Sequence, residues 1–80
     1  MERMEVGSVV EVTAGKEKGS IFVVVKDFNT RQVGIADGRH RKLSNPRKKG
    51  IKHLKRLGKL EVLPNRDRLL WESLSSYRGS

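Results

Sequence analysis

The sequence predicts a mostly β domain that ends in a short α-helix. The apolar residues change type partway along the chain: eight of the nine valines precede Gly38, and all eight leucines lie from Leu43 onward. Valine is stiff at χ1 and suits strands, whereas leucine forms helices well and fills cores of either kind. We therefore expect a β-rich first half and a mixed second half. A chain of 80 residues can build only one small core.

Three strands are expected in the first half. The first lies in residues 8–15 (SVVEVTAG), where valines occupy alternating positions, and the second lies in residues 21–28 (IFVVVKDF). The second run is so continuously apolar that we expect a central strand covered on both faces. The third strand lies in residues 32–37 (QVGIAD) and stops at Asp37-Gly38, a strong hairpin signal. Polar turns join the three into a meander.

The second half is less regular. Residues 39–44 (RHRKLS) are expected to form a fourth strand that Asn45-Pro46 interrupts, and residues 47–50 (RKKG) are expected to form a charged loop. The apolar residues of 51–57 (IKHLKRL) recur every three positions, which favours a helical or 3₁₀ turn and leaves a strand as the alternative. Residues 59–64 (KLEVLP) alternate and are a candidate for the strand that closes the sheet.

A short amphipathic helix of about three turns is expected after Pro64, with Asn65 or Asp67 as its N-cap. We therefore divide the chain into a β-rich domain at residues 1–63 and a C-terminal helix and tail at residues 64–80. The helix presents an apolar stripe at i, i+4 and i+7, which consists of Leu70, Leu74 and Tyr77.

The net charge of +9 is concentrated in one stretch, residues 39–59, which contains ten basic residues and no acidic one. A charge run is often only a solvated face that keeps a protein in solution. Here the charges are of one sign, apolar residues are interleaved with them, and four of the ten are arginines, which suit bidentate phosphate contacts. These features favour a polyanionic partner, most simply nucleic acid.

Neither catalysis nor metal binding is indicated. The chain has no cysteine, and neither His40 nor His53 belongs to a cluster with metal-ligand spacing, so we expect both histidines to be polar members of the basic face. No serine lies in a nucleophile-elbow pattern, and the carboxylates are scattered. We expect no enzyme activity, no metal and no cofactor. No apolar run indicates a signal peptide or a membrane span, so a cytoplasmic protein without membrane contact is expected.

The expected positions of the four aromatic residues indicate which kind of nucleic acid is bound. Phe22, Phe28 and Trp71 are expected in the core, and Tyr77 is expected to pack or to lie at the edge. Few rings would then be exposed to stack on single-stranded bases. Recognition through the backbone and shape of a structured nucleic acid is favoured.

Residues 6–35 (VGSVVEVTAGKEKGSIFVVVKDFNTRQVGI) resemble the KOW motif of ribosomal proteins and transcription elongation factors. In that motif a glycine follows a basic turn between two valine-rich strands; Gly19 matches it, and Gly7 and Gly15 match its usual companions. With IADGRHRKLSNPRKKGIKHL, the chain resembles the archaeal and eukaryotic fourteen-e large-subunit ribosomal protein family and short bacterial KOW-domain RNA-binding proteins. The resemblance covers roughly Val6 to Leu57. Ser8 departs from it, because family members often carry an acidic residue there.

The resemblance implies a small SH3-like β-barrel of about five strands that binds ribosomal RNA through its loops and basic segment. It suggests a non-catalytic protein of translation, located in the cytoplasm on the large ribosomal subunit and monomeric when free. It places Lys16 and Lys18 in the KOW turn and residues 47–53 in the basic loop. Together with the charge pattern, it gives these candidate RNA-binding residues: Lys16, Lys18, Arg39, Arg41, Lys42, Arg47, Lys48, Lys49, Lys52, His53, Lys55 and Arg56.

Two other functions stay open at this point. The first is a protein-interaction module of the translation or transcription machinery, which would dock partners such as ribosomal proteins on the helix face of Leu70, Leu74 and Tyr77. The second is a general nucleic-acid binder that also takes DNA.

Overall fold

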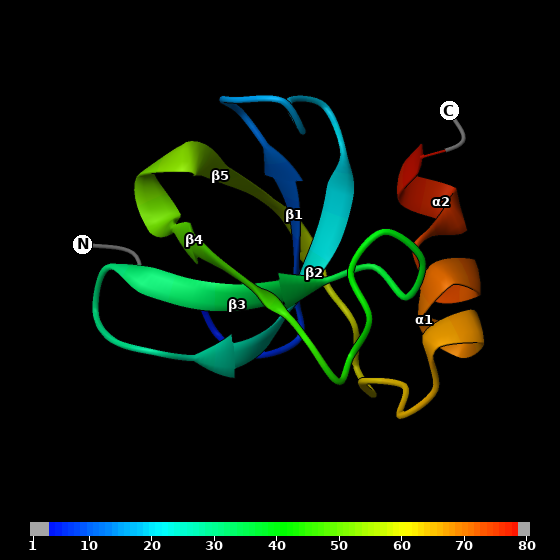
Figure 1. Cartoon of the computed structure of the whole chain (residues 1–80). Helices are drawn as coiled ribbons and strands as arrows, with labels where there is room; N and C mark the ends of the chain where they lie inside the picture. The colour runs from blue at the N-terminus through cyan, green and yellow to red at the C-terminus, as the bar shows by residue number, and fades with distance from the viewer. Residues whose placement is uncertain (1–3, 79–80) are drawn as a thin grey trace.

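The computed structural model describes residues 4–78. Within them, five antiparallel strands form one sheet, and two short helices follow at the C-terminal end (Figure 1). A single 3₁₀ turn, η1, joins the fourth strand to the fifth. The elements are β1 (Ser8–Val12), β2 (Ile21–Asp27), β3 (Gln32–Ala36), β4 (Arg47–Gly50), η1 (Ile51–His53), β5 (Leu54–Lys59), α1 (Asp67–Ser73) and α2 (Ser75–Arg78). The predicted class, mostly β with a short C-terminal helix, is confirmed.

The strand order is β4-β3-β2-β1-β5, so β2 is central and β4 and β5 are the two edges. Although they are at opposite edges, β4 and β5 are consecutive in the chain and only η1 separates them. The backbone of η1 is attached on both sides: the N–H of Ile51 donates to the carbonyl of Arg31, and the N–H of Thr13 donates to the carbonyl of His53, both at 2.8 Å. The sheet is thus curled, which is compatible with the expected SH3-like barrel.

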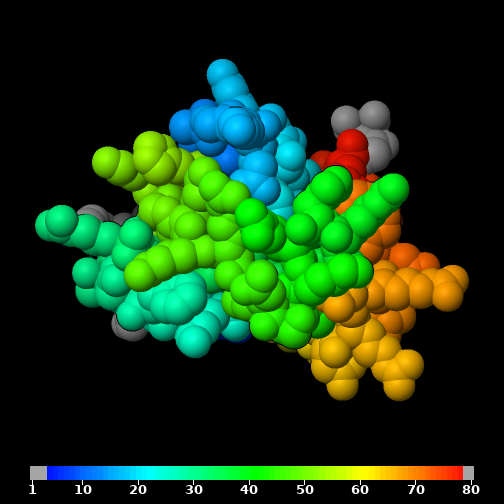
Figure 2. Space-filling view, viewed as in Figure 1, coloured from blue at the N-terminus to red at the C-terminus, as the bar shows by residue number. Residues whose placement is uncertain are grey.

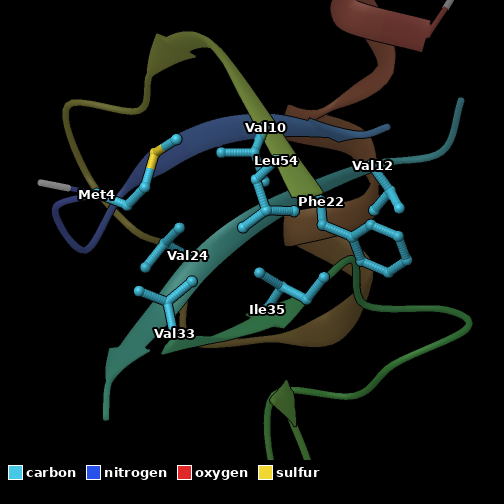
Figure 3. Close-up of a cluster of buried hydrophobic side chains, with 8 residues drawn as sticks. All are labelled: Met4, Val10, Val12, Phe22, Val24, Val33, Ile35 and Leu54. Carbon is cyan, nitrogen blue, oxygen red and sulfur yellow. The ribbon is translucent and has the colours of Figure 1, made fainter. Parts of the chain in front are cut away.

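The concave face of the curled sheet encloses the first part of the core. Figure 3 shows its eight buried side chains converging from β1, β2, β3 and β5 and from the N-terminal segment. Because strand side chains alternate between faces, the residues between them point to the opposite face. The eight are Met4, Val10, Val12, Phe22, Val24, Val33, Ile35 and Leu54.

Part of the convex face of the sheet is covered by α1 and α2. Leu70 and Leu74 are fully buried there against Val9, Val23 and Ala36. Central strand β2 is therefore covered on both faces, as its continuous apolar run predicts. Each fully buried leucine contributes about 1.5–3 kcal/mol to folding, so the C-terminal helices share their core with the sheet.

Two predictions for the basic segment are wrong. Residues 39–44 form turns and bends, whereas the predicted loop at 47–50 is strand β4. The backbone N–H groups of Arg39 and Arg41 bond to the side chain of Asp37, which keeps this stretch out of the sheet. Strand β4 tolerates its charges because an edge strand pairs on one side only. Residues 51–57 contain both alternatives, a 3₁₀ turn and then β5.

The C-terminal end also differs from the prediction. β5 ends at Lys59, so residues 60–64 do not close the sheet. The expected single helix is interrupted at Leu74, and its N-cap is Arg66, with no side-chain cap bond. Asp67 is instead the first helical residue, and its Oδ1 accepts a 2.7 Å hydrogen bond from the N–H of Leu43. A negative charge in the first turn complements the helix dipole, while this bond fixes α1 to the basic segment.

Candidate nucleic-acid interface

The turn between β1 and β2 is closed by its own backbone. The N–H of Lys18 donates to the carbonyl of Gly15 at 3.2 Å, and the N–H of Gly19 donates to the carbonyl of Val12 at 2.7 Å. Gly15 and Gly19 have φ of 88° and 90°, in the left-handed region that favours glycine, as the sequence predicts for a tight turn. The turn therefore holds the exposed side chains of Lys16 and Lys18 on a defined support.

Strand β4 lies against this turn. Nε of Arg47 is 3.3 Å from Oε1 of Glu17, and a methyl group built on Gly15 would lie 3.7 Å from Nζ of Lys49. In Figure 2 the turn (light blue) adjoins the β4 region (yellow-green) on the face in view. The structure therefore brings together four of the predicted residues that are distant in sequence. We call this cluster the turn–strand surface: Lys16, Lys18, Arg47 and Lys49.

Lys48, between Arg47 and Lys49, belongs to the opposite face of the sheet. Arg47 and Lys49 are paired in register with Ile35 and Val33, whose side chains enter the concave core. Lys48 is paired with Gly34, so it lies on the convex face. The sequence run RKKG is thus split between two surfaces.

A buried carboxylate organises the loop that starts the basic segment. Oδ1 of Asp37 accepts hydrogen bonds from the N–H groups of Arg39 and Arg41, both at 2.9 Å, and its Oδ2 lies 2.8 Å from Nδ1 of His40. Burial raises the pKa of Asp37, but the hydrogen bonds from Arg41, Arg39 and His40 outweigh it and hold the pKa below its ordinary value. His40 thus has a carboxylate partner three residues earlier in the chain.

Trp71 is half-buried at the base of this loop, beside the cations that Asp37 positions. The guanidinium carbon of Arg78 is 3.5 Å from the centre of its ring, and that of Arg39 is 5.1 Å away. The ring of His40 meets it edge-on, with the centroids 5.8 Å apart. The indole is thus in contact with three side chains of the same chain, and Arg39 is held against α1.

The other candidate residues are spread along the loop, η1 and β5. Lys42, Lys52, Lys55 and Arg56 are exposed, whereas Arg41 and His53 are partly buried. Lys55 is opposite Glu11 in the β1–β5 pairing. The twelve predicted residues therefore come from several elements: the β1–β2 turn, the loop before β4, the edge strands β4 and β5, and η1 between them.

Phe28 is not a core residue. Its side chain is 39% exposed, whereas Phe22 is buried as predicted and Trp71 is partly buried. Two lysines, Lys26 and Lys48, place their ammonium groups over the Phe28 ring. Sequence reasoning missed Phe28 because it follows an apolar run, and it missed Asp37, although an aspartate before glycine is typical of a side chain that bonds its own backbone.

The predicted docking stripe on the helix is not an exposed surface. Leu70 and Leu74 are fully buried against the sheet, and Tyr77 packs on β5, where a methyl group on Gly58 would lie 2.6 Å from the Tyr77 hydroxyl. These three side chains are occupied by the chain's own sheet. A partner protein cannot use them without displacing the helices.

Two further properties concern the described residues as a group. Across residues 4–78, no three histidine, aspartate or glutamate side chains come close enough to hold a metal ion together. None of the helices in this part of the chain is long and apolar enough to cross a membrane.

Comparison with protein-family models and with curated proteins finds no match to the chain.

Proposed function

We propose that this protein is a non-catalytic RNA-binding protein that contacts the phosphates of structured RNA. The observation that carries the proposal is the turn–strand surface. Lys16 and Lys18 come from the turn that resembles a KOW turn, and Arg47 and Lys49 come from the acid-free segment. Glu17, which pairs with Arg47, lies among them, so the four cations leave a net positive charge beside a turn that its own backbone closes. A local excess of positive charge favours phosphate binding.

The proposed target is ribosomal RNA of the large subunit, in the cytoplasm. This part of the proposal is supported by the resemblance to the KOW motif and to the fourteen-e ribosomal protein family. The distribution of cations supports a folded RNA over a short linear one, since further exposed cations lie on the loop before β4, on η1 and on β5. A folded RNA can reach several such positions at once.

Binding to a structured fragment of large-subunit ribosomal RNA, compared with duplex DNA of equal length, tests the proposal. If five or six cations meet phosphates, log K is expected to fall against log salt with a slope of about −4 to −5. Tighter binding to RNA than to DNA at matched salt, and co-sedimentation with ribosomes at low salt, are the expected results. Equal affinity for both would instead identify a general polyanion binder, and no binding at low salt would overturn the proposal.

A further inference from the structure

Phe28 forms an exposed aromatic surface on the convex side of the sheet, beyond the end of β2. Its ring is flanked by two cations: Nζ of Lys26 is 5.0 Å and Nζ of Lys48 is 5.3 Å from the ring centre. The two lysines come from β2 and β4, on either side of β3. An aromatic face between two positive charges matches the chemistry of a nucleotide, which has a flat base and flanking phosphates.

The position of the ring depends on Gly34. This glycine is paired with Lys26 on one side and with Lys48 on the other, so the three residues form a row across the sheet. A methyl group on Gly34 would lie 3.0 Å from Cε2 of Phe28, too close for ordinary contact. Glycine weakens a strand interior and often marks a close approach. Here it lets the ring lie against the backbone of β3.

The local fold does not itself need an aromatic side chain at this position. The turn after β2 is closed by backbone groups, with the N–H of Phe28 donating to the carbonyl of Gln32 at 3.2 Å. It is further fixed by Asn29, whose Oδ1 accepts from the N–H groups of Arg31 and Gln32 at 2.8 and 2.9 Å. Any residue except proline can supply the N–H at position 28. The ring is therefore a rigidly placed surface feature beyond what the turn requires.

Trp71, by contrast, is a poor stacking surface. The Arg78 guanidinium is only 3.5 Å from the centre of its ring, and its Nη2 also donates to the Trp71 carbonyl at 2.6 Å. A base would have to displace this bonded arginine. At Phe28 the flanking ammonium groups are compact and lie at the ends of flexible stems, so they can move to phosphates while a base covers the ring.

We propose that Phe28 is a stacking site for one unpaired base of the bound RNA, with Lys26 and Lys48 contacting the phosphates on either side of that base. This inference rests on the proposed function and deepens it, because it adds an unpaired nucleotide to the structured RNA that the cations recognise. The charge of the two lysines favours a nucleic acid over an uncharged apolar partner. The site lies on the convex face, separate from the turn–strand surface on the concave face.

Two RNA hairpins of the ribosomal fragment's length provide the test: one with a single bulged 2-aminopurine and one fully paired. The variants are Phe28→Leu, which removes the ring, and Phe28→Tyr, which retains it. Phe28→Leu is expected to weaken binding to the bulged hairpin about tenfold and binding to the paired one less than about twofold. Phe28→Tyr should bind both as the wild type does. Fluorescence of the 2-aminopurine should be quenched by the wild type and not by Phe28→Leu.

Salt dependence separates the ring from the lysines. Phe28→Leu should leave the slope of log K against log salt unchanged, while Lys26→Gln with Lys48→Gln should reduce it by about 1 to 2. Circular dichroism of each variant verifies that the sheet is intact. Binding of the wild type to the paired hairpin reports on the proposed function alone. If Phe28→Leu lost affinity equally for both hairpins, or lost none for the bulged one, the stacking inference would be overturned. The proposed RNA binding would be unaffected by that result.

Discussion

The carboxylate of Asp37 lies 2.8 Å from Nδ1 of His40, at the start of the basic segment, residues 39–59. Asp37 is the last acidic residue before the segment and is almost fully buried, while the His40 side chain is mostly exposed. One acidic side chain thus fixes the start of a loop whose charged side chains are otherwise basic. This carboxylate therefore fixes the backbone from which the side chains of Arg39 and Arg41 project.

Replacing Asp37 with asparagine is expected to destabilise the fold by about 1–3 kcal/mol at pH 7, because its buried hydrogen bonds to a charged acceptor become weaker bonds to a neutral one. The pKa of Asp37 is lower in the folded chain than its ordinary 3.8. Its stabilisation is therefore fully present above that ordinary value and is lost as the pH falls through the lower folded pKa. Urea unfolding should show that the difference in the free energy of unfolding between the wild type and Asp37→Asn becomes smaller from pH 7 to pH 3. A difference that stays constant would contradict this role.

Gly38 and Gly19 offer a matched pair of glycine variants. Both have positive φ, 85° and 90°, so alanine is strained at either position. Around Gly19 a methyl group meets nothing within 4 Å, whereas at Gly38 it would overlap the carbonyl oxygen of Asp67. Gly19→Ala should cost about 1–2 kcal/mol of backbone strain. Gly38→Ala should cost clearly more and loosen α1 from the loop.

The single tryptophan makes this difference measurable. Trp71 lies in α1, and its backbone N would be 3.1 Å from a methyl group on Gly38. Gly38→Ala should therefore shift the Trp71 emission toward that of a solvated indole, while Gly19→Ala should not. Equal unfolding free energies and equal emission for the two variants would show that the loop and helix are not closely packed.

The first three strands were predictable because their signal is local. Alternation and continuous apolar runs decide which residues of β1, β2 and β3 enter a core, and turn-forming residues bound each run. β4 gives no such signal, since Arg47–Gly50 contains no apolar side chain. It is a strand because its backbone pairs with β3 and its charges remain at an edge, which depends on contacts that are distant in sequence.

The candidate site shows the same division. The polar turn that the sequence predicts between the first two strands depends on local residues, and the structure has a turn there that contains Lys16 and Lys18. The sequence predicts Phe28 as a core residue, because an aromatic ring at the end of the predicted valine-rich strand is more often buried than exposed. In the structure, the ring lies on the convex face of the sheet, where Gly34 of the neighbouring strand has no side chain. No spacing within the chain reports that pairing, so the aromatic surface becomes evident only in the folded sheet.

Leu74 and Leu69 test whether the C-terminal helix is part of the core. Leu74 is fully buried against the sheet, and Leu69 is 48% exposed. Leu74→Ala is expected to destabilise the whole domain by about 2–5 kcal/mol, and Leu69→Ala by no more than about 0.5 kcal/mol. Chemical unfolding followed by the β-sheet circular dichroism signal measures both. If Leu74→Ala melted only the helix and left the sheet signal unchanged, residues 64–80 would be an appendage independent of the sheet.

The RNA contribution of the turn can be measured with a charge-matched control. Lys16→Gln with Lys18→Gln removes two exposed cations from the turn–strand surface, and Arg66→Gln with Arg68→Gln removes two exposed cations near the start of α1. The turn variant should weaken binding to the structured RNA and reduce the salt slope by about 1 to 2. The control variant should show much smaller changes in RNA affinity and in salt slope, because its charges lie outside the basic segment. Equal losses would mean that the net charge of +9, and not the position of the turn lysines, determines the affinity.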